Sequence, residues 1–205
     1  MPSIYQLKPA FQNRLRPLVR GLAGAGVTPN QVTLAALALS VAVGAAIALL
    51  PEQRLVLLLV PLTMLVRMAL NAIDGMLARE HGMQTVLGGF LNELCDVLAD
   101  AALYLPFAVV LPQYAWIVVA AAFAAVVAEY AGIAAQALGG SRRYDGPMGK
   151  SDRAFVFGLI ALLLGAGVAP GPWCGMLLAA TALLAALTAI NRVRKGVAEI
   201  AAGKK

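Results

Sequence analysis

Charged residues are scarce in this chain of 205 residues: Asp, Glu, Lys and Arg make up 13% of it, whereas 61% is hydrophobic. In soluble proteins about 25% of residues are charged. The polar stretches between the apolar runs are also too short to fold as a soluble domain. The composition therefore excludes an ordinary soluble protein and indicates a polytopic membrane protein.

Cysteine and histidine are also rare. Cys95 and Cys174 lie in separate apolar segments that we expect near opposite membrane faces, which argues against a disulfide between them. The single histidine, His81, falls in a short polar link, and we interpret it as a loop residue rather than a metal ligand. A cleavable signal peptide is not evident, because the N-terminal stretch stays polar and basic too long before the first apolar run. Internal repeats are lacking.

Long apolar runs dominate the rest of the sequence and predict an all-α fold, a bundle of six transmembrane helices. The expected spans cover about residues 28–50, 54–79, 85–110, 114–138, 154–168 and 173–190. A helix of about 20 apolar residues crosses the roughly 30 Å hydrocarbon layer. Thr28, Pro29 and Gln31 predict the start of the first helix as N-cap, first helical residue and capping-box partner, and Pro51 its end.

The segment before the first span predicts an N-terminal amphipathic juxtamembrane helix. Pro9 can occupy its first turn. Four apolar residues then recur at helical spacing: Phe11, Leu15, Leu18 and Leu22. Three arginines lie elsewhere around the same helix: Arg14, Arg16 and Arg20. Such a helix would lie on the lipid surface; the alternative is a disordered basic tail.

The basic residues predict the topology. Fourteen of the 16 Lys and Arg residues fall in the N-terminal segment, at Arg79, in the loop after the fourth span and after residue 190. The positive-inside rule then places both termini in the cytoplasm. We therefore expect a cytoplasmic juxtamembrane segment (1–26), a six-helix membrane domain (27–192) and a basic cytoplasmic tail (193–205). The net charge of +6 reflects this excess of basic residues on the cytoplasmic side. We therefore do not interpret it as a sign of nucleic-acid binding.

Two ladders of polar and small residues lie at the cytoplasmic ends of the second and third predicted spans. The first comprises Asn71, Asp74, Gly75, Ala78 and Arg79, and the second Gly88, Asn92, Asp96 and Asp100. At about 100° per residue, Asn71 to Ala78 share one helical face, and so do the residues of the second ladder, which are four apart. A short link makes the helices antiparallel, so the two faces can meet. Oxygen ligands gathered in this way suit Mg²⁺, and carboxylates inside a membrane are functional by default.

Two further charges inside predicted spans, Arg67 and Glu129, need partners. We expect them to form a structural pair within the membrane rather than to act in catalysis.

The spacing of the ladders resembles the signature of the CDP-alcohol phosphotransferases (CDP-alcohol phosphatidyltransferases) of class I. The matching pattern is Asp74-Gly75, two residues, Ala78-Arg79, eight residues, Gly88, three residues, Asn92, three residues and Asp96. The family has four aspartates, and here Asn71 and Asn92 stand at the first and third of those positions. The resemblance also covers the juxtamembrane helix, the stretch VTPNQVT at the entry into the first span and the six-span layout.

The resemblance implies a metal-dependent phospholipid synthase of the bacterial inner membrane with its active site on the cytoplasmic side. It would transfer a phosphatidyl group from CDP-diacylglycerol to a small polar alcohol, phosphorylated or not, and release CMP. Asp96 would be the catalytic base. The implied ligands for one or two Mg²⁺ (or Mn²⁺) ions are Asn71, Asp74, Asn92 and Asp96, with Asp100 as an additional candidate. The implied CDP-binding residues are Asn30, Thr33, Asp74, Gly75, Ala78, Arg79 and Gly88. The family also implies a homodimer.

A second basic cluster follows the fourth span: Arg142, Arg143, Lys150 and Arg153. One interpretation is topology alone. The other is an acceptor-binding site for a phosphate or carboxylate, which would suit glycerol 3-phosphate or an inositol phosphate.

Three functions fit these observations. The first is the phospholipid synthase, and the second is a catalytically inactive CDP-lipid-binding membrane protein of the same fold, in which the asparagines have removed the activity. The third, a small transporter, is the weakest, because the polar residues lie at one membrane edge rather than the midplane and inverted halves are not visible.

Overall fold

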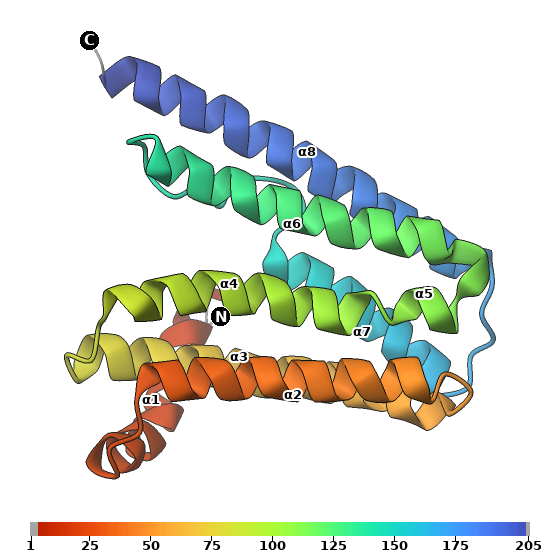
Figure 1. Cartoon of the computed structure of the whole chain (residues 1–205), viewed down its shortest axis with the longest axis horizontal. Coiled ribbons are helices and arrows are strands. Elements are labelled where there is room, and N and C mark those ends of the chain that lie inside the picture. Colours follow the sequence, from red (N-terminus) through yellow and green to blue (C-terminus); the bar gives the residue numbers. More distant parts are fainter. Residues whose placement is uncertain (1–3, 204–205) are drawn as a thin grey trace. The chain divides into compact units, whose positions relative to one another are not determined.

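The computed structural model describes residues 4–203, with side chains from residue 9 onward, and within them it is helical without strands (Figure 1). The elements are α1 (Ile4–Gly24), α2 (Pro29–Leu49), η1 (Arg54–Leu58), α3 (Leu59–Glu80), α4 (Val86–Tyr104), α5 (Phe107–Val110), η2 (Pro112–Tyr114), α6 (Ala115–Ala137), α7 (Lys150–Gly165) and α8 (Pro172–Gly203). The chain forms two compact units, Met1–Ala42 with Leu62–Ala99, and Val43–Pro61 with Asp100–Lys205.

The start of α2 confirms the predicted capping box. The Gln31 backbone N–H lies 3.3 Å from Thr28 Oγ1, and the Thr28 backbone N–H donates to Gln31 Oε1 at 2.9 Å. Pro29 is the first residue of the helix, a position whose backbone N–H would have no partner within the helix, so the missing N–H of proline costs no hydrogen bond. This cap fixes the N-terminal end of α2, from which Asn30 and Thr33 project.

Helix α4 differs from the third predicted span at its C-terminal end. Thr85 caps its start, since the Gly88 N–H donates to Thr85 Oγ1 at 2.9 Å. The helix ends at Tyr104, and the short α5 follows after Pro106. A proline ring clashes with the carbonyl four residues earlier and donates no hydrogen bond, so the expected continuous span of residues 85–110 is broken there.

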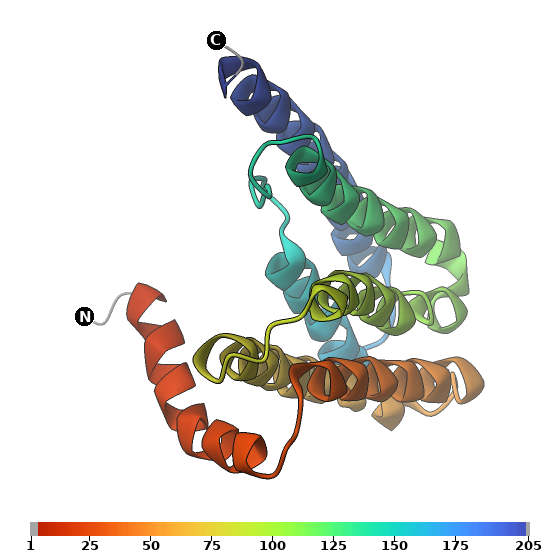
Figure 2. The same cartoon turned by 60° about the vertical axis from the view of Figure 1, so that its left-hand side comes forward.

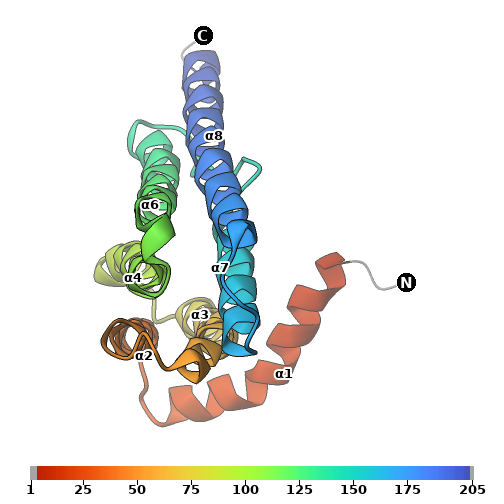
Figure 3. The same cartoon turned by 90° about the vertical axis from the view of Figure 1, so that its right-hand side faces the viewer.

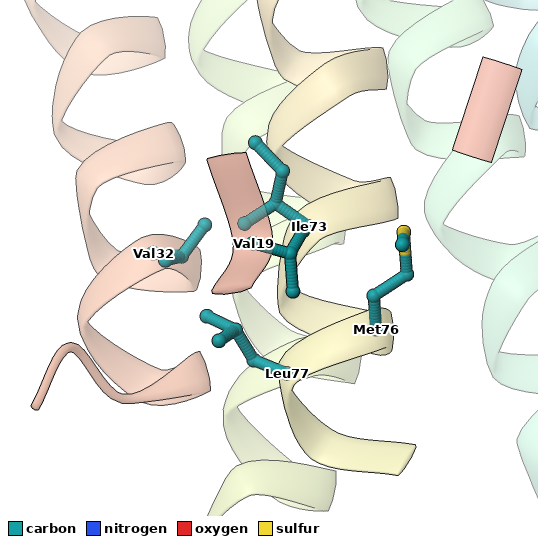
Figure 4. Close-up of a cluster of buried hydrophobic side chains, with 5 residues drawn as sticks. All are labelled: Val19, Val32, Ile73, Met76 and Leu77. Carbon is teal, nitrogen blue, oxygen red and sulfur yellow. The ribbon is translucent and has the colours of Figure 1, made fainter. Parts of the chain in front are cut away.

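The core of the first unit joins α1, α2 and α3 (Figure 4). Its buried residues are Val19 from α1, Val32 from α2, and Ile73, Met76 and Leu77 from α3. Leu15 and Leu22, expected to face lipid, pack against this core instead, whereas Leu18 is 52% exposed. Figure 2 shows that α1 bends along its length, as a helix with Pro17 inside it can.

In the second unit, α8 lies alongside α6 (Figures 1 and 3). Small residues allow the close approach: a Cβ atom on Gly196 would lie 2.9 Å from the Ala135 Cβ. Helix α8 continues to Gly203, so the expected tail of residues 193–205 is helical over its described part. The reason is that residues 191–203 contain no proline and keep contacts with their own unit, such as that between Glu199 and Ser141.

Within residues 4–203, four segments are long and apolar enough to cross a membrane: Pro29–Leu49, Arg54–Glu80, Pro112–Ala137 and Pro172–Gly203. They coincide with the first, second, fourth and sixth predicted spans. Helix α4 is not among these segments because it carries three acidic residues, Glu93, Asp96 and Asp100. Helix α7 is not among them because it has only 16 residues. Large apolar side chains are widely exposed, Trp116 at 86% for example, as expected for a surface that contacts lipid.

The closest backbone approach within the second unit yields a testable prediction. A Cβ atom at Gly44 of α2 would collide with the Ala102 carbonyl oxygen of α4. We expect Gly44→Val to force the two helices apart and lower the stability by about 1–3 kcal/mol or more, seen as a lower Tm in detergent. Ala45→Val, at the exposed neighbouring position, is the matched control. An equal Tm for the two variants would contradict this packing.

Candidate active site

The two polar ladders meet at Asp96. Asn71 Nδ2, from α3, donates to Asp96 Oδ1 of α4 at 3.3 Å. Arg67 Nη2, one turn before Asn71 on α3, lies 3.8 Å from the same oxygen. The Asp96 side chain keeps 30% exposure, so a ligand could reach it. The predicted convergence of these two helical faces is confirmed where Asn71 contacts Asp96.

Asp74 is held from α2. Its carboxylate oxygen Oδ2 lies 3.0 Å from Thr33 Oγ1, which also lies 3.1 Å from the Pro29 carbonyl oxygen. The residue is 7% exposed. Since a threonine hydroxyl carries one proton, it donates to one of these oxygens at a time. Thr33 therefore belongs to the surroundings of Asp74.

Two predicted glycines adjoin polar side chains. A Cβ atom on Gly75 would lie 2.6 Å from Arg79 Nη2, and one on Gly88 would lie 2.8 Å from Asn30 Oδ1. Helices α2, α3 and α4 therefore bring the side chains of Asn30 and Arg79 against bare backbone. Ala78 lies half-buried on the same face of α3.

The donor set in the first unit suits a hard divalent ion, although it is poor in charge. Within the described chain no three His, Cys, Asp or Glu side chains form a metal-binding group. Two carboxylates, Asp74 and Asp96, remain with the amides of Asn71 and the exposed Asn92. Carboxylate and amide oxygens are ligands that Mg²⁺ and similar ions accept, so this set fits such an ion. Asp100, the additional candidate, is buried in the second unit 3.9 Å from Arg153 Nη2.

The basic cluster of the second unit surrounds a carboxylate. Glu129 accepts from Arg153 Nη2 at 2.8 Å and from Arg142 Nη2 at 3.4 Å, and Arg192 Nη1 lies 3.3 Å away. Arg153 is 0% exposed and Arg192 2%. Glu129 thus has three arginine partners within its own unit, and Arg67 lies beside Asp96 in the first unit. Sequence reasoning left Arg192 out of the site, because its basic charge at the end of a span resembled a topology signal.

Other basic residues of the cluster hold the loop between α6 and α7. Arg143 Nη2 lies 2.7 Å from Asp145 Oδ2, and Arg143 Nη1 lies 3.2 Å from Glu199 Oε2. Lys195 Nζ donates to Asp145 Oδ1 at 2.7 Å. These bonds, first Lys195 and then Arg143, hold the pKa of Asp145 below its usual value. Arg143 therefore links the loop to α8 through Glu199. Lys150, the remaining member of the predicted cluster, is half-buried at the start of α7.

Four segments long and apolar enough to cross a membrane, with polar side chains of α3 and α4 that meet at Asp96, are typical of an integral membrane protein. The profile of the CDP-alcohol phosphatidyltransferase family matches residues 26–192. The chain belongs to this family.

Individual relatives agree with this assignment. Inner membrane protein YnbA of Escherichia coli is 45% identical over 192 residues, 94% of this chain and 95% of that protein. Phosphatidylinositol phosphate synthase of Corynebacterium glutamicum is 38% identical over 104 residues, 51% of this chain and 45% of that protein.

Solved structures share the fold. The phosphatidylinositol phosphate synthase of Mycobacterium tuberculosis with CDP-DAG bound superposes with a TM-score of 0.75 at 22% identity, covering 88% of this chain and 92% of that one. The same enzyme with manganese and citrate gives 0.72, covering 88% of each chain.

Glu129 compensates buried positive charge, so its loss should destabilise the second unit. We expect Glu129→Gln to lower the stability by about 3–5 kcal/mol, because removing one partner leaves buried arginines without a counter-charge. The Tm in detergent measures this. Glu52→Gln, which changes an exposed carboxylate, is the control. An unchanged Tm for Glu129→Gln would mean that these ion pairs do not support the fold.

The loop held by Asp145 should respond to acid. Since the folded-state pKa of Asp145 is lowered, its bonds stabilise the fold above the unfolded pKa of about 3.9 and are lost as the pH falls through the folded pKa. The side chain is partly exposed and its partner Lys195 is more so, so water screens the pairs and we expect less than about 1 kcal/mol. Asp145→Asn should lower the Tm at pH 7, and its difference from the wild type should shrink as the pH falls below about 3.9. A constant difference at every pH would contradict this assignment.

Proposed function

We propose that the chain transfers a phosphatidyl group from CDP-diacylglycerol to a small polar alcohol and releases CMP. Family membership and the names of the synthase relatives support this reaction. The observation that carries it is the meeting of the two ladders at Asp96, where α3 and α4 pool their polar side chains. That arrangement provides a base and oxygen ligands at one place.

In this reaction the hydroxyl oxygen of the acceptor attacks the phosphorus on the lipid side of the pyrophosphate. The bond from that phosphorus to the CMP oxygen breaks, and CMP leaves with the electron pair. Asp96 accepts the hydroxyl proton. Asn71 and Arg67 hold Asp96 Oδ1 from α3 and so orient the carboxylate for this transfer.

A divalent ion, Mg²⁺ or Mn²⁺, would be held by Asp74 and Asp96 with the amide oxygens of Asn71 and Asn92, and Asp100 remains a further candidate. When bound, the ion neutralises the phosphates and makes the phosphorus easier to attack. Support comes from the donor set and from the manganese complex of the related fold.

The nucleotide would lie along α2 and α3. We assign to it Asn30 and Thr33, then Asp74, Gly75, Ala78, Arg79 and Gly88. At Gly75 and Gly88 the backbone carries no side chain, so a ligand that displaced the Arg79 and Asn30 side chains could approach it closely. The Arg79 guanidinium can pair with a phosphate in two-point fashion.

The acceptor site would use the arginines around Glu129. Arg142 and Arg153 are the best-supported members of the predicted set, whereas the bonds of Arg143 to Asp145 and Glu199 favour a structural role. An acceptor phosphate would share these arginines with Glu129. Glycerol and inositol, each tested with its phosphate ester, therefore form the informative acceptor panel.

The same proposal includes the membrane arrangement. Helices α4 and α7 would complete six spans, and α1 would lie at the lipid surface. Both termini and the site would face the cytoplasm. The membrane would be a bacterial inner membrane, as the name of the relative inner membrane protein YnbA of Escherichia coli suggests. The family resemblance favours a homodimer.

A second candidate function is an inactive CDP-lipid-binding protein. The observation in its favour is that two of four family aspartates are asparagines and that Asp96 already has donors from Asn71 and Arg67. The two functions differ only in chemistry, so an assay of product formation separates them.

Purified protein with Mg²⁺ or Mn²⁺, CDP-diacylglycerol and the acceptor panel should release CMP. Asp96→Asn should lower the rate by about 10²–10⁴-fold, because it removes the proton acceptor. Glu52→Gln, an exposed carboxylate away from both ladders in sequence, should keep the wild-type rate. Folded protein that binds CDP-diacylglycerol but releases no CMP with any acceptor would support the inactive alternative.

A further inference from the structure

A buried threonine of α8, Thr188, holds the loop between α6 and α7. Its hydroxyl proton is used within the helix, because Thr188 Oγ1 donates to the Leu184 carbonyl oxygen at 2.8 Å. The oxygen can still accept, and the Met148 backbone N–H of the loop donates to it at 2.9 Å. Thr188 and Met148 are both buried, and a buried backbone N–H needs such an acceptor.

The same loop residue holds a guanidinium of the basic cluster. Arg153 Nη1 donates to the Met148 carbonyl oxygen at 3.3 Å, and Arg153 Nη2 donates to Glu129 Oε1 at 2.8 Å. Asp100 Oδ2 is farther away, 3.9 Å from Nη2. The Arg153 Nε atom is buried and has no hydrogen-bond partner among residues 9–203. The orientation of Arg153 therefore depends on two hydrogen-bond anchors, Glu129 and the loop backbone at Met148.

The loop backbone lies directly against Thr188. Gly146, two residues before Met148, has a φ of +138°, a conformation that favours glycine. A Cβ atom on Gly146 would collide with Thr188 Cγ2 and lie 2.7 Å from Thr188 Oγ1. Only a bare backbone can approach α8 in this way, and the approach brings the Met148 N–H within reach of the hydroxyl.

We propose that Thr188 is a positioning residue of the acceptor site. Thr188 fixes the loop at Met148, and Met148 fixes Arg153 for binding the phosphate of a phosphorylated acceptor. This rests on the proposed function in taking Arg153 as part of the acceptor site. Without the Thr188 hydroxyl, the Met148 N–H would be buried without a partner, so the loop would shift and Arg153 would lose one anchor. A guanidinium that is already oriented binds an oxyanion more tightly than one that must be ordered on binding.

The test measures dissociation constants on the detergent-purified full chain for inorganic phosphate, glycerol 3-phosphate and inositol phosphate, with CDP-diacylglycerol as the comparison ligand. Thr188→Val keeps the shape of the side chain and removes the acceptor oxygen. The Kd of each anion that binds the wild type should rise at least about fivefold, the loss that corresponds to one net hydrogen bond. Thr188→Ser keeps the hydroxyl and should keep the wild-type Kd. The Kd of CDP-diacylglycerol should not change, because its candidate residues lie on α2, α3 and α4.

Thr181→Val is the matched control. Thr181 is also buried on α8 and donates to the Leu177 carbonyl oxygen at 2.8 Å, but within the described chain its hydroxyl holds no loop N–H. This variant should keep the wild-type Kd for the anions. Gly146→Ala pushes the loop away from Thr188 and should raise the same Kd, so it tests the proposal where Thr188→Val does not fold.

Four results would overturn the proposal: a wild-type anion Kd in folded Thr188→Val, an equal rise in Thr181→Val, an equal loss of CDP-diacylglycerol affinity, or a wild-type chain that binds none of the three anions. Anion binding that weakens as expected, on a chain that releases no CMP, would refute the proposed function alone. CMP release together with an unchanged anion Kd in Thr188→Val would refute this inference alone.

Discussion

The contact between Asp96 of α4 and the pair Asn71 and Arg67 of α3 is the constraint on which the first unit depends. A carboxylate within an apolar helix is stable only with donors or a cation nearby. The capped start of α2 adds Thr33, whose hydroxyl lies 3.0 Å from the Asp74 carboxylate of α3. Three helices therefore share one polar edge, and the chemistry of a CDP-alcohol phosphatidyltransferase needs such an edge.

In the second unit the buried charges are positive, and a carboxylate compensates them. Arg142, Arg153 and Arg192 come from separate segments and converge on Glu129. A cluster rich in arginine can hold an anionic acceptor, but its positive charges repel one another when no anion is bound. Glu129 stabilises it by compensating part of the charge. If the acceptor binds here as we propose, the fold and the reaction would use the same ion pairs, and a substitution at Glu129 would affect both.

The sequence predicted local features well. Thr28 and Gln31 form the capping box that their spacing indicated, and the helical period placed the two ladders face to face. The break at Pro106 was missed because a long apolar run outweighed the one residue that cannot donate a hydrogen bond. The partners of Glu129 were missed for another reason: Arg192 is 63 positions away, and no local pattern reports a contact between distant segments.

We propose that Asp74 and Asp96 together bind a cation. A crystal of the full chain grown with Mn²⁺ and CDP-diacylglycerol tests it through the anomalous scattering of manganese. We expect one peak, within about 2.0–2.5 Å of oxygens from both carboxylates. A map in which either carboxylate faces lipid, or in which the peak lies away from α3 and α4, would contradict it.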